Sequence, residues 1–134
     1  MQLLFDDRVK KILFGLWCLL WLIIAVLLLA PLSSPMSMSY WDVIGHFLVF
    51  ACMAFAAVGF SHRGSDLTLL AAATVAGGMA LEFAQGLVPH RTFDILDMGA
   101  NTLGAMVGYG GALTVLLLVI RPAAEAQAKR AAEA

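Results

Sequence analysis

The sequence predicts an all-α fold, a bundle of four membrane-spanning helices with both termini on the cytoplasmic side. Of the 134 residues, 62% are hydrophobic and only 13% are charged, about half the charged share of a soluble domain. The apolar residues also fall into four runs that approach the length needed to cross a bilayer. A soluble domain of this size buries only about 60–70% of its chain surface, so it could not hide this much apolar surface.

Charge and cysteine usage argue against two classes of function. The formal net charge is −1 and the sequence pI is about 6.2, and the charges do not cluster as a nucleic-acid partner would require. The two cysteines, Cys18 and Cys52, lie inside apolar runs and not in a CxxC or Cys/His spacing. They are therefore expected to be small apolar packing residues.

The first predicted span covers residues 12–30 and follows a short cytoplasmic N-terminus at residues 1–11. The run is uninterrupted and apolar, and at 1.5 Å per residue it extends roughly 28 Å, close to the hydrocarbon thickness of about 30 Å. Basic residues before an apolar run also resemble a signal peptide, but the apolar region of a signal peptide is only about 7–15 residues long. A retained anchor is therefore predicted. Pro31 and Pro35 follow it, and proline cannot continue a helix.

Three further spans are predicted from the remaining apolar runs, at residues 43–60, 67–88 and 98–120. A short polar turn separates the second span from the third, and a Pro-containing turn separates the third from the fourth. Asp42 and Asp97 each precede a span, so each is a candidate to cap that helix.

The distribution of Lys and Arg predicts the orientation of the bundle. Four spans place most basic residues on one side, together with the Ala-rich tail at residues 121–134; they are Arg8, Lys10, Lys11, Arg63, Arg121, Lys129 and Arg130. Only Arg91 lies on the other side. Because Lys and Arg concentrate in cytoplasmic segments, the tail and both termini are predicted to be cytoplasmic, and residues 31–42 and 89–97 to form the outer loops.

This topology brings polar residues together at the outer end of three spans. They form pairs with i,i+3 or i,i+4 spacing, which places each pair on one face of its helix. The pairs are Asp42 and His46, Glu82 and Gln85, and Asp97 and Asn101. All lie within roughly 10 Å of the outer boundary at 1.5 Å per residue. The sequence therefore predicts one polar pocket at that depth, lined by three helices.

Glu82 is the most informative of these residues, because ionisable groups inside membrane spans are costly and usually face a polar interior. Glu82 and His46 are the candidates for an acid or base in catalysis. The candidates for binding are Asp42, Gln85, Arg91, Asp97 and Asn101. Simpler interpretations stay open beside these. The aspartates also suit helix caps, the two amide side chains suit hydrogen bonds between helices, and the arginine suits a loop anchor.

Small residues on the fourth span predict tight helix packing beneath the pocket. They recur at every fourth position and form a small-xxx-small ridge of Ala100, Gly104, Gly108 and Ala112. Gly77 and Gly78 on the third span offer a matching close approach.

No metal and no cofactor are predicted. Asp42, His46, Glu82 and Asp97 offer oxygen and nitrogen ligands, but a single histidine among carboxylates matches no particular metal well. The sequence has no GxSxG motif, no Cys/His pair and no glycine-rich phosphate loop. No separate nucleophile is evident, which counts against covalent catalysis.

Three segments resemble the VanZ-like family of small bacterial membrane proteins. Residues 42–47, Asp-Val-Ile-Gly-His-Phe, resemble the family's Asp-Lys-x-x-His-Phe, and residues 82–85, Glu-Phe-Ala-Gln, resemble its Glu-x-x-Gln. Residues 91–104 resemble its Arg-x-x-x-x-x-Asp-x-x-x-Asn-x-x-Gly. Val43 and Phe50 depart from the pattern, because the family commonly has Lys at the first position and often Tyr at the second. If that Lys binds an anion in the family, the role here falls to the arginine at the start of the third segment or is absent.

The resemblance implies a VanZ-like four-helix domain over residues 12–120, located in the bacterial cytoplasmic membrane. The family's namesake is associated with low-level resistance to teicoplanin-type glycopeptide antibiotics. The resemblance therefore implies a role in the cell envelope, and it does not by itself supply a reaction.

Binding is the preferred function. The pocket would hold a polar group of a membrane lipid, a lipid-linked wall precursor or a glycopeptide-type antibiotic at the outer leaflet. The alternative is a membrane-embedded hydrolase or transferase acting on an envelope lipid head group, with His46 or Glu82 as acid or base. A purely structural polar lock between helices is the third interpretation. Whether the chain is an enzyme, and its oligomeric state, are left open.

Overall fold

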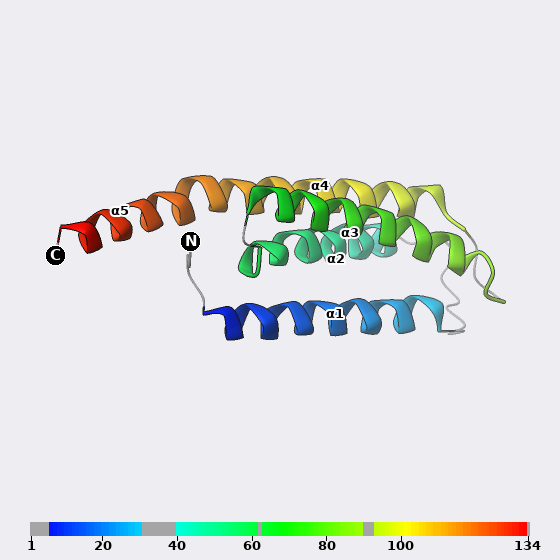
Figure 1. Cartoon of the computed structure of the whole chain (residues 1–134). Coiled ribbons are helices and arrows are strands. Elements are labelled where there is room, and N and C mark those ends of the chain that lie inside the picture. The colour runs from blue at the N-terminus through cyan, green and yellow to red at the C-terminus, as the bar shows by residue number, and fades with distance from the viewer. Residues whose placement is uncertain (1–5, 31–39, 62, 90–92, 134) are drawn as a thin grey trace.

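The computed structural model of the chain describes residues 6–30, 40–61, 63–89 and 93–133, and helices make up most of that part. Four long helices are present: α1 (Asp7–Leu29), α2 (Tyr40–Ala56), α3 (Gly64–Gln85) and α4 (Ile95–Val115). A 3₁₀ turn, η1 (Ala57–Gly59), extends α2, and a π turn, η2 (Leu116–Ile120), joins α4 to α5 (Arg121–Ala132). The four helices lie side by side (Figure 1), and each is long and apolar enough to cross a membrane. The predicted all-α, four-span fold is confirmed.

Each helix begins three to five residues before the apolar run that predicted it, α1 at Asp7 and α3 at Gly64, for example. The reason is that hydrophobicity marks the part of a helix that suits the bilayer, whereas polar residues are well accommodated in the first turn. At the start of α3, the backbone N–H of Arg63 donates to the carboxylate of Asp66 at 3.0 Å. The turn before α3 and the turn before α4 therefore end three residues earlier than the sequence predicted.

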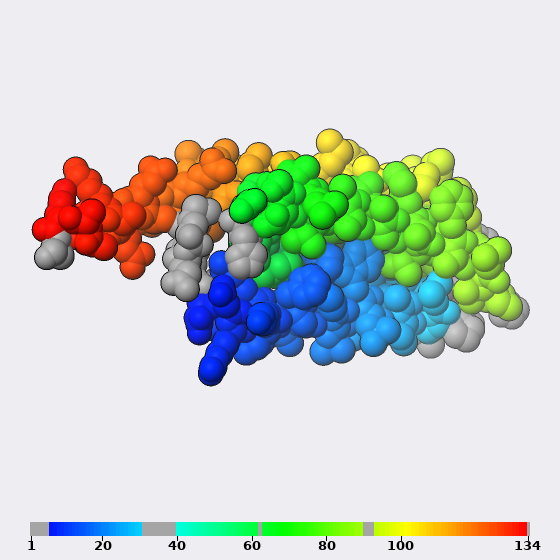
Figure 2. Space-filling view, in the orientation of Figure 1, coloured from blue at the N-terminus to red at the C-terminus, as the bar shows by residue number. Residues whose placement is uncertain are grey.

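Residues predicted as a cytoplasmic tail continue the fourth helix. α5 follows α4 through the π turn and ends at Ala132, and none of its side chains is buried. Figure 2 shows α5 projecting beyond the other helices. Pro122 lies at the start of α5, and it lacks the N–H that an α-helix needs. The π turn, in which the hydrogen bonds span five residues, directly precedes α5.

The ridge of small residues on α4 packs against α2. A Cβ atom added to Gly104 would collide with the backbone of Phe47, and one added to Gly108 would collide with the backbone of Ala51. The two helices therefore touch backbone to backbone. The sequence analysis paired this ridge with the glycines of α3, whereas Gly104 and Gly108 contact α2. Gly78 of α3 approaches α4 at Asn101 instead, where it makes room for the Phe50 ring and for the Cβ atom of Asn101.

Aromatic side chains attach α1 to α2 and α3. The indole N–H of Trp17 donates to the backbone oxygen of Met53 at 3.0 Å, and the Trp21 ring lies over Gly77 where a larger residue would collide with it. Apart from these contacts α1 is the most exposed of the four, with only 6% of its most apolar window buried. A long apolar helix with this much free surface is suited to contact with lipid.

Candidate functional site

The C-terminal ends of α1 and α3 and the N-terminal ends of α2 and α4 lie at the same end of the bundle (Figure 1). Most of the polar side chains predicted to converge belong to this end. At the opposite end, a cleft of about 550 Å³ is lined by Lys10 and Lys11 together with Asp7 and Asp66. The described Lys and Arg residues all belong to that opposite end, whereas the described charged residues at the first end are acidic.

His46 is the centre of a polar cluster that also contains Glu82, Asp97 and Asn101. It lies in the second turn of α2, and its side chain is 7% exposed. Its Nδ1 lies 2.9 Å from Oδ1 of Asn101, and its Nε2 lies 3.9 Å from Oδ2 of Asp97. An amide oxygen can only accept a hydrogen bond, so Nδ1 of the histidine carries a proton and donates it to Asn101. The other ring nitrogen faces the carboxylate.

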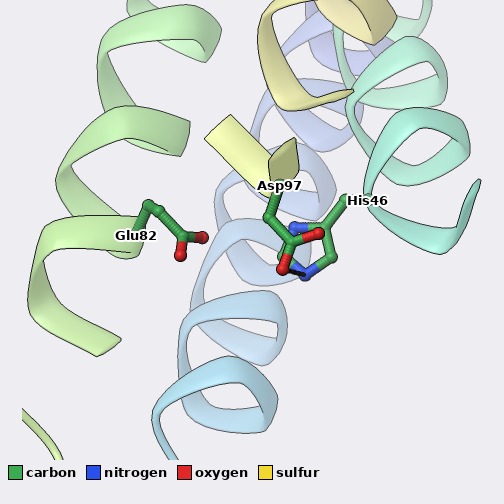
Figure 3. A group of neighbouring side chains, drawn as sticks. All are labelled: His46, Glu82 and Asp97. Atoms are coloured by element: carbon green, nitrogen blue, oxygen red, sulfur yellow. Dashed lines mark ion pairs between the residues drawn. The ribbon is translucent and has the colours of Figure 1, made fainter. Parts of the chain in front are cut away.

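Glu82 reaches the same point from α3. Its side chain is 1% exposed, and Figure 3 shows it pointing toward Asp97 and His46. One carboxylate oxygen, Oε1, accepts a hydrogen bond of 2.7 Å from the backbone N–H of Asp94, just before α4. This bond ties the end of α3 to the start of α4. His46, Glu82 and Asp97 each offer one ligand-type atom to a group in which all such atoms lie within 4.8 Å of one another.

Three buried side-chain atoms in this cluster have no hydrogen-bond partner among the residues that the structure describes: Oε2 of Glu82, Oδ1 of Asp97 and Nδ2 of Asn101. Leaving a buried polar atom unpaired costs about 1–3 kcal/mol, and more when it is charged. Native proteins keep few such atoms, and a ligand, ion or water usually explains those that they keep. The three unpaired atoms therefore suggest that the cluster binds a polar ligand, an ion or water.

The cluster is rich in negative charge. Glu82 interacts electrostatically with Asp97, His46 and Asp94, and Asp97 also interacts with Asp42. One histidine thus stands among four carboxylates. In the described part of the chain, neither Lys nor Arg forms an ion pair with Glu82 or Asp97. This composition favours a positive group or a cation at the centre.

The two helix caps predicted from the sequence are wrong. Asp97 is not the cap of α4, because the helix begins at Ile95 and Asp94 occupies the cap position, where its Oδ1 accepts from the Leu96 N–H at 2.8 Å. Asp42 lies inside the first turn of α2, which begins at Tyr40. The sequence analysis did not assign the cap of α4 to Asp94. Its position shortly before an apolar run was the available signal.

The remaining predicted site residues have different positions. Gln85 is buried but lies one turn beyond Glu82, and its Nε2 donates to the backbone oxygen of Leu28 at 3.1 Å, so it ties α3 to α1. Asp42 is exposed at the edge of the cluster. Arg91 lies outside the described residues.

An apolar groove runs along the same end of the bundle. Its volume is about 400 Å³, and it lies between α2 and α4, with Val43, Phe47, Leu96 and Leu103 among its lining residues. His46, Glu82 and Asp97 are not among the residues that line this groove or the cleft at the other end. The groove lies between the two helices that supply His46 and Asp97 to the polar cluster.

Comparison with known proteins identifies the family. The VanZ/LLP1 family matches residues 3–119. An uncharacterized protein of the fission yeast Schizosaccharomyces pombe is 32% identical over 100 residues, which are 72% of this chain. The chain spans only 59% of the length of that relative. No solved structure matches the chain. The chain has four helices that can cross a membrane, and it belongs to the VanZ/LLP1 family.

Proposed function

We propose that this protein binds the polar head group of an envelope lipid at the outer leaflet of the membrane, through His46, Glu82, Asp97 and Asn101. A lipid-linked wall precursor and a glycopeptide-type antibiotic offer related polar groups and belong to the same proposal. The observation that carries it is the set of three buried, unpaired polar atoms on Glu82, Asp97 and Asn101. In a chain of apolar helices these atoms are costly unless a ligand contacts them.

The surroundings of the cluster support a lipid as the ligand. The apolar groove between α2 and α4 lies at the same end as the polar cluster, so an acyl chain can lie along the helices whose polar residues contact the head group. Arg91, which precedes α4 in the sequence, is the residue proposed to contact a phosphate of the head group.

The proposed location is the cytoplasmic membrane of a bacterium, with the cluster at the outer face. Lys10, Lys11, Arg63 and Arg121 all belong to the opposite end of the bundle, which supports this orientation because basic residues concentrate on the cytoplasmic side. In this orientation the cluster would lie at the outer leaflet, where envelope lipids and externally added antibiotics are accessible.

One observation favours an enzyme as the second candidate function. Asn101 orients the ring of His46, and the free Nε2 faces Asp97. A histidine whose ring is oriented by a hydrogen bond is a suitable proton donor or acceptor. The reaction would be hydrolysis or group transfer at the head group, with Glu82 as the acid.

Native mass spectrometry of the detergent-purified protein tests the proposal. The wild type is expected to retain a lipid, and Glu82→Gln is expected to lose it while remaining folded. The matched control is Glu125→Gln, because Glu125 is exposed on α5. Retention of lipid with loss of a head-group reaction would favour the enzyme. Equal lipid retention and equal activity in all three proteins would make the cluster a structural lock and overturn the proposal.

A further inference from the structure

We propose that His46, Glu82 and Asp97 bind one divalent transition-metal ion, with Zn²⁺ the best match, and that this ion receives a phosphate oxygen of the head group at its open coordination position. The metal site stands on the geometry alone, whereas the phosphate contact rests on the proposed function. A metal was not expected from the sequence, because one histidine among carboxylates is an unspecific set. The arrangement of the three side chains changes that judgement.

The spacing of the donor atoms is close to that of a metal site. Three different helices supply the donors, which lie within 4.8 Å of one another, and the His46–Asp97 pair is separated by 3.9 Å (Figure 3). Around a tetrahedral ion with bonds of about 2.0–2.2 Å, donor atoms lie about 3.3–3.6 Å apart. The donors therefore have to approach by about 1.5 Å at most. Because His46 and Asp97 already lie 3.9 Å apart, most of this movement falls to Glu82, and rotation of its side chain can supply it.

His46 is already oriented as a metal ligand. Its Nδ1 lies 2.9 Å from the Asn101 amide oxygen, so in the neutral imidazole the lone pair is on Nε2, the atom that faces the Asp97 carboxylate. In that state the lone pair and the carboxylate oxygen repel each other unless a proton or a metal cation lies between them, and a metal ion can bind both atoms. Metal-bound histidines almost always donate their second ring N–H to an oxygen acceptor, and Asn101 supplies that acceptor.

Charge and unpaired atoms point to the same ion. Two carboxylates and a neutral imidazole carry a charge of −2, which one divalent cation neutralises. Oε2 of Glu82 and Oδ1 of Asp97 are buried and have no hydrogen-bond partner in the described part of the chain, and Glu82 is only 1% exposed. Burying two carboxylates in a membrane protein without a compensating charge is costly. A bound cation removes that cost.

The ligand set selects the metal and leaves a position open. Imidazole favours zinc and neighbouring transition metals over Mg²⁺ and Ca²⁺, which prefer oxygen ligands only. Zinc sites with three protein ligands usually keep a fourth position for water or substrate. A phosphate oxygen at that position would let an acidic cluster bind an anionic head group. The negative charge of the cluster would otherwise repel it.

Metal analysis of the full chain tests the site. The detergent-purified protein is stripped with a chelator, incubated with Zn²⁺, dialysed and analysed for bound metal. One Zn²⁺ per chain is expected for the wild type and for Glu125→Gln, and less than one tenth of that for Glu82→Gln and Asp97→Asn. Asn101→Leu is expected to weaken the Zn²⁺ affinity by about 10–100-fold, because it removes the acceptor that orients His46. Equal zinc content in the wild type and all variants would overturn the site.

Two further measurements separate this inference from the proposed function. Replacement of Zn²⁺ by Co²⁺ in the stripped wild type is expected to give visible absorption bands that His46→Ala lacks. Circular dichroism verifies that each variant is folded, so a missing band reports the ligand and not misfolding. Chelator treatment is expected to release the co-purified phospholipid. Phospholipid retained after complete removal of metal would overturn the metal–phosphate contact and leave the proposed function intact. Zn²⁺ bound without any co-purified phospholipid would leave the metal site intact and overturn both the metal–phosphate contact and the proposed function.

Discussion

Replacement of Gly104 by Ala is expected to destabilise the protein strongly for so small a change. A Cβ atom at this position would lie 3.0 Å from the carbonyl carbon and 3.1 Å from the Cα atom of Phe47. Carbon atoms in favourable contact lie about 3.5–4.0 Å apart, so α2 and α4 would have to separate by about 0.5–1 Å. The obstructing atoms belong to the backbone and cannot rotate away. Overpacking of this kind costs about 1–3 kcal/mol.

Two other glycines of the same helix provide matched controls. A Cβ atom added to Gly99 or Gly110 meets no atom within 4 Å. Alanine at these positions avoids the cost of glycine in a helix, about 0.5–1 kcal/mol, and is expected to be neutral or stabilising. The free energy of unfolding is measured by circular dichroism in mixed detergent micelles. Equal effects of Gly104→Ala and Gly99→Ala would refute the backbone contact between α2 and α4.

The same substitution is expected to weaken the functional site. The hydrogen bond between His46 and Asn101 bridges the α2–α4 interface within one turn of Gly104, at 2.9 Å. A separation of about 0.5–1 Å would lengthen the distance between Nδ1 of His46 and Oδ1 of Asn101 to the range in which the hydrogen bond is lost, since a contact of about 3.6 Å is not a hydrogen bond. Gly104→Ala is therefore expected to lower zinc and lipid retention, whereas Gly110→Ala is not.

Two further predictions concern the attachments around the site. Trp17→Phe removes the indole donor to Met53 and is expected to cost about 0.5–1.5 kcal/mol of unfolding free energy, measured in the same micelles; an unchanged value would show that α1 does not depend on this bond. Asp94→Ala removes the cap of α4 and is expected to cost about 1 kcal/mol, but it keeps the backbone N–H that binds Glu82. Zinc and lipid retention should therefore persist, and their loss would mean that the Asp94 carboxylate itself contacts the ligand.

The fold and the convergence of the site follow from sequence patterns that have a direct geometric meaning. Spacings of three and four residues place Glu82 with Gln85, and Asp97 with Asn101, on single helix faces. An even number of spans returns these faces to one end of the bundle. The structure brings His46, Glu82, Asp97 and Asn101 together as this reasoning predicts.

The details that the sequence reasoning missed depend on choices that no local pattern fixes. Asp94 and Asp97 both precede apolar residues, and only the path of the turn decides that Asp94 caps α4. Gln85 shares a helix face with Glu82, yet it bonds to the α1 backbone because α1 lies beside that turn. The ridge at Gly104 fits any close helix, and tertiary packing selects α2.

The central claim is that side chains from separate membrane helices share one buried polar site. Asn101 is the only asparagine in the sequence, so ¹³C-asparagine labels it alone, and ¹⁵N-histidine labels three residues. Solid-state NMR of the protein in lipid bilayers then measures the dipolar coupling between Asn101 Cγ and histidine Nδ1. A strong coupling to one histidine, lost in His46→Ala, is predicted. No coupling in a protein whose helices are intact would contradict the account.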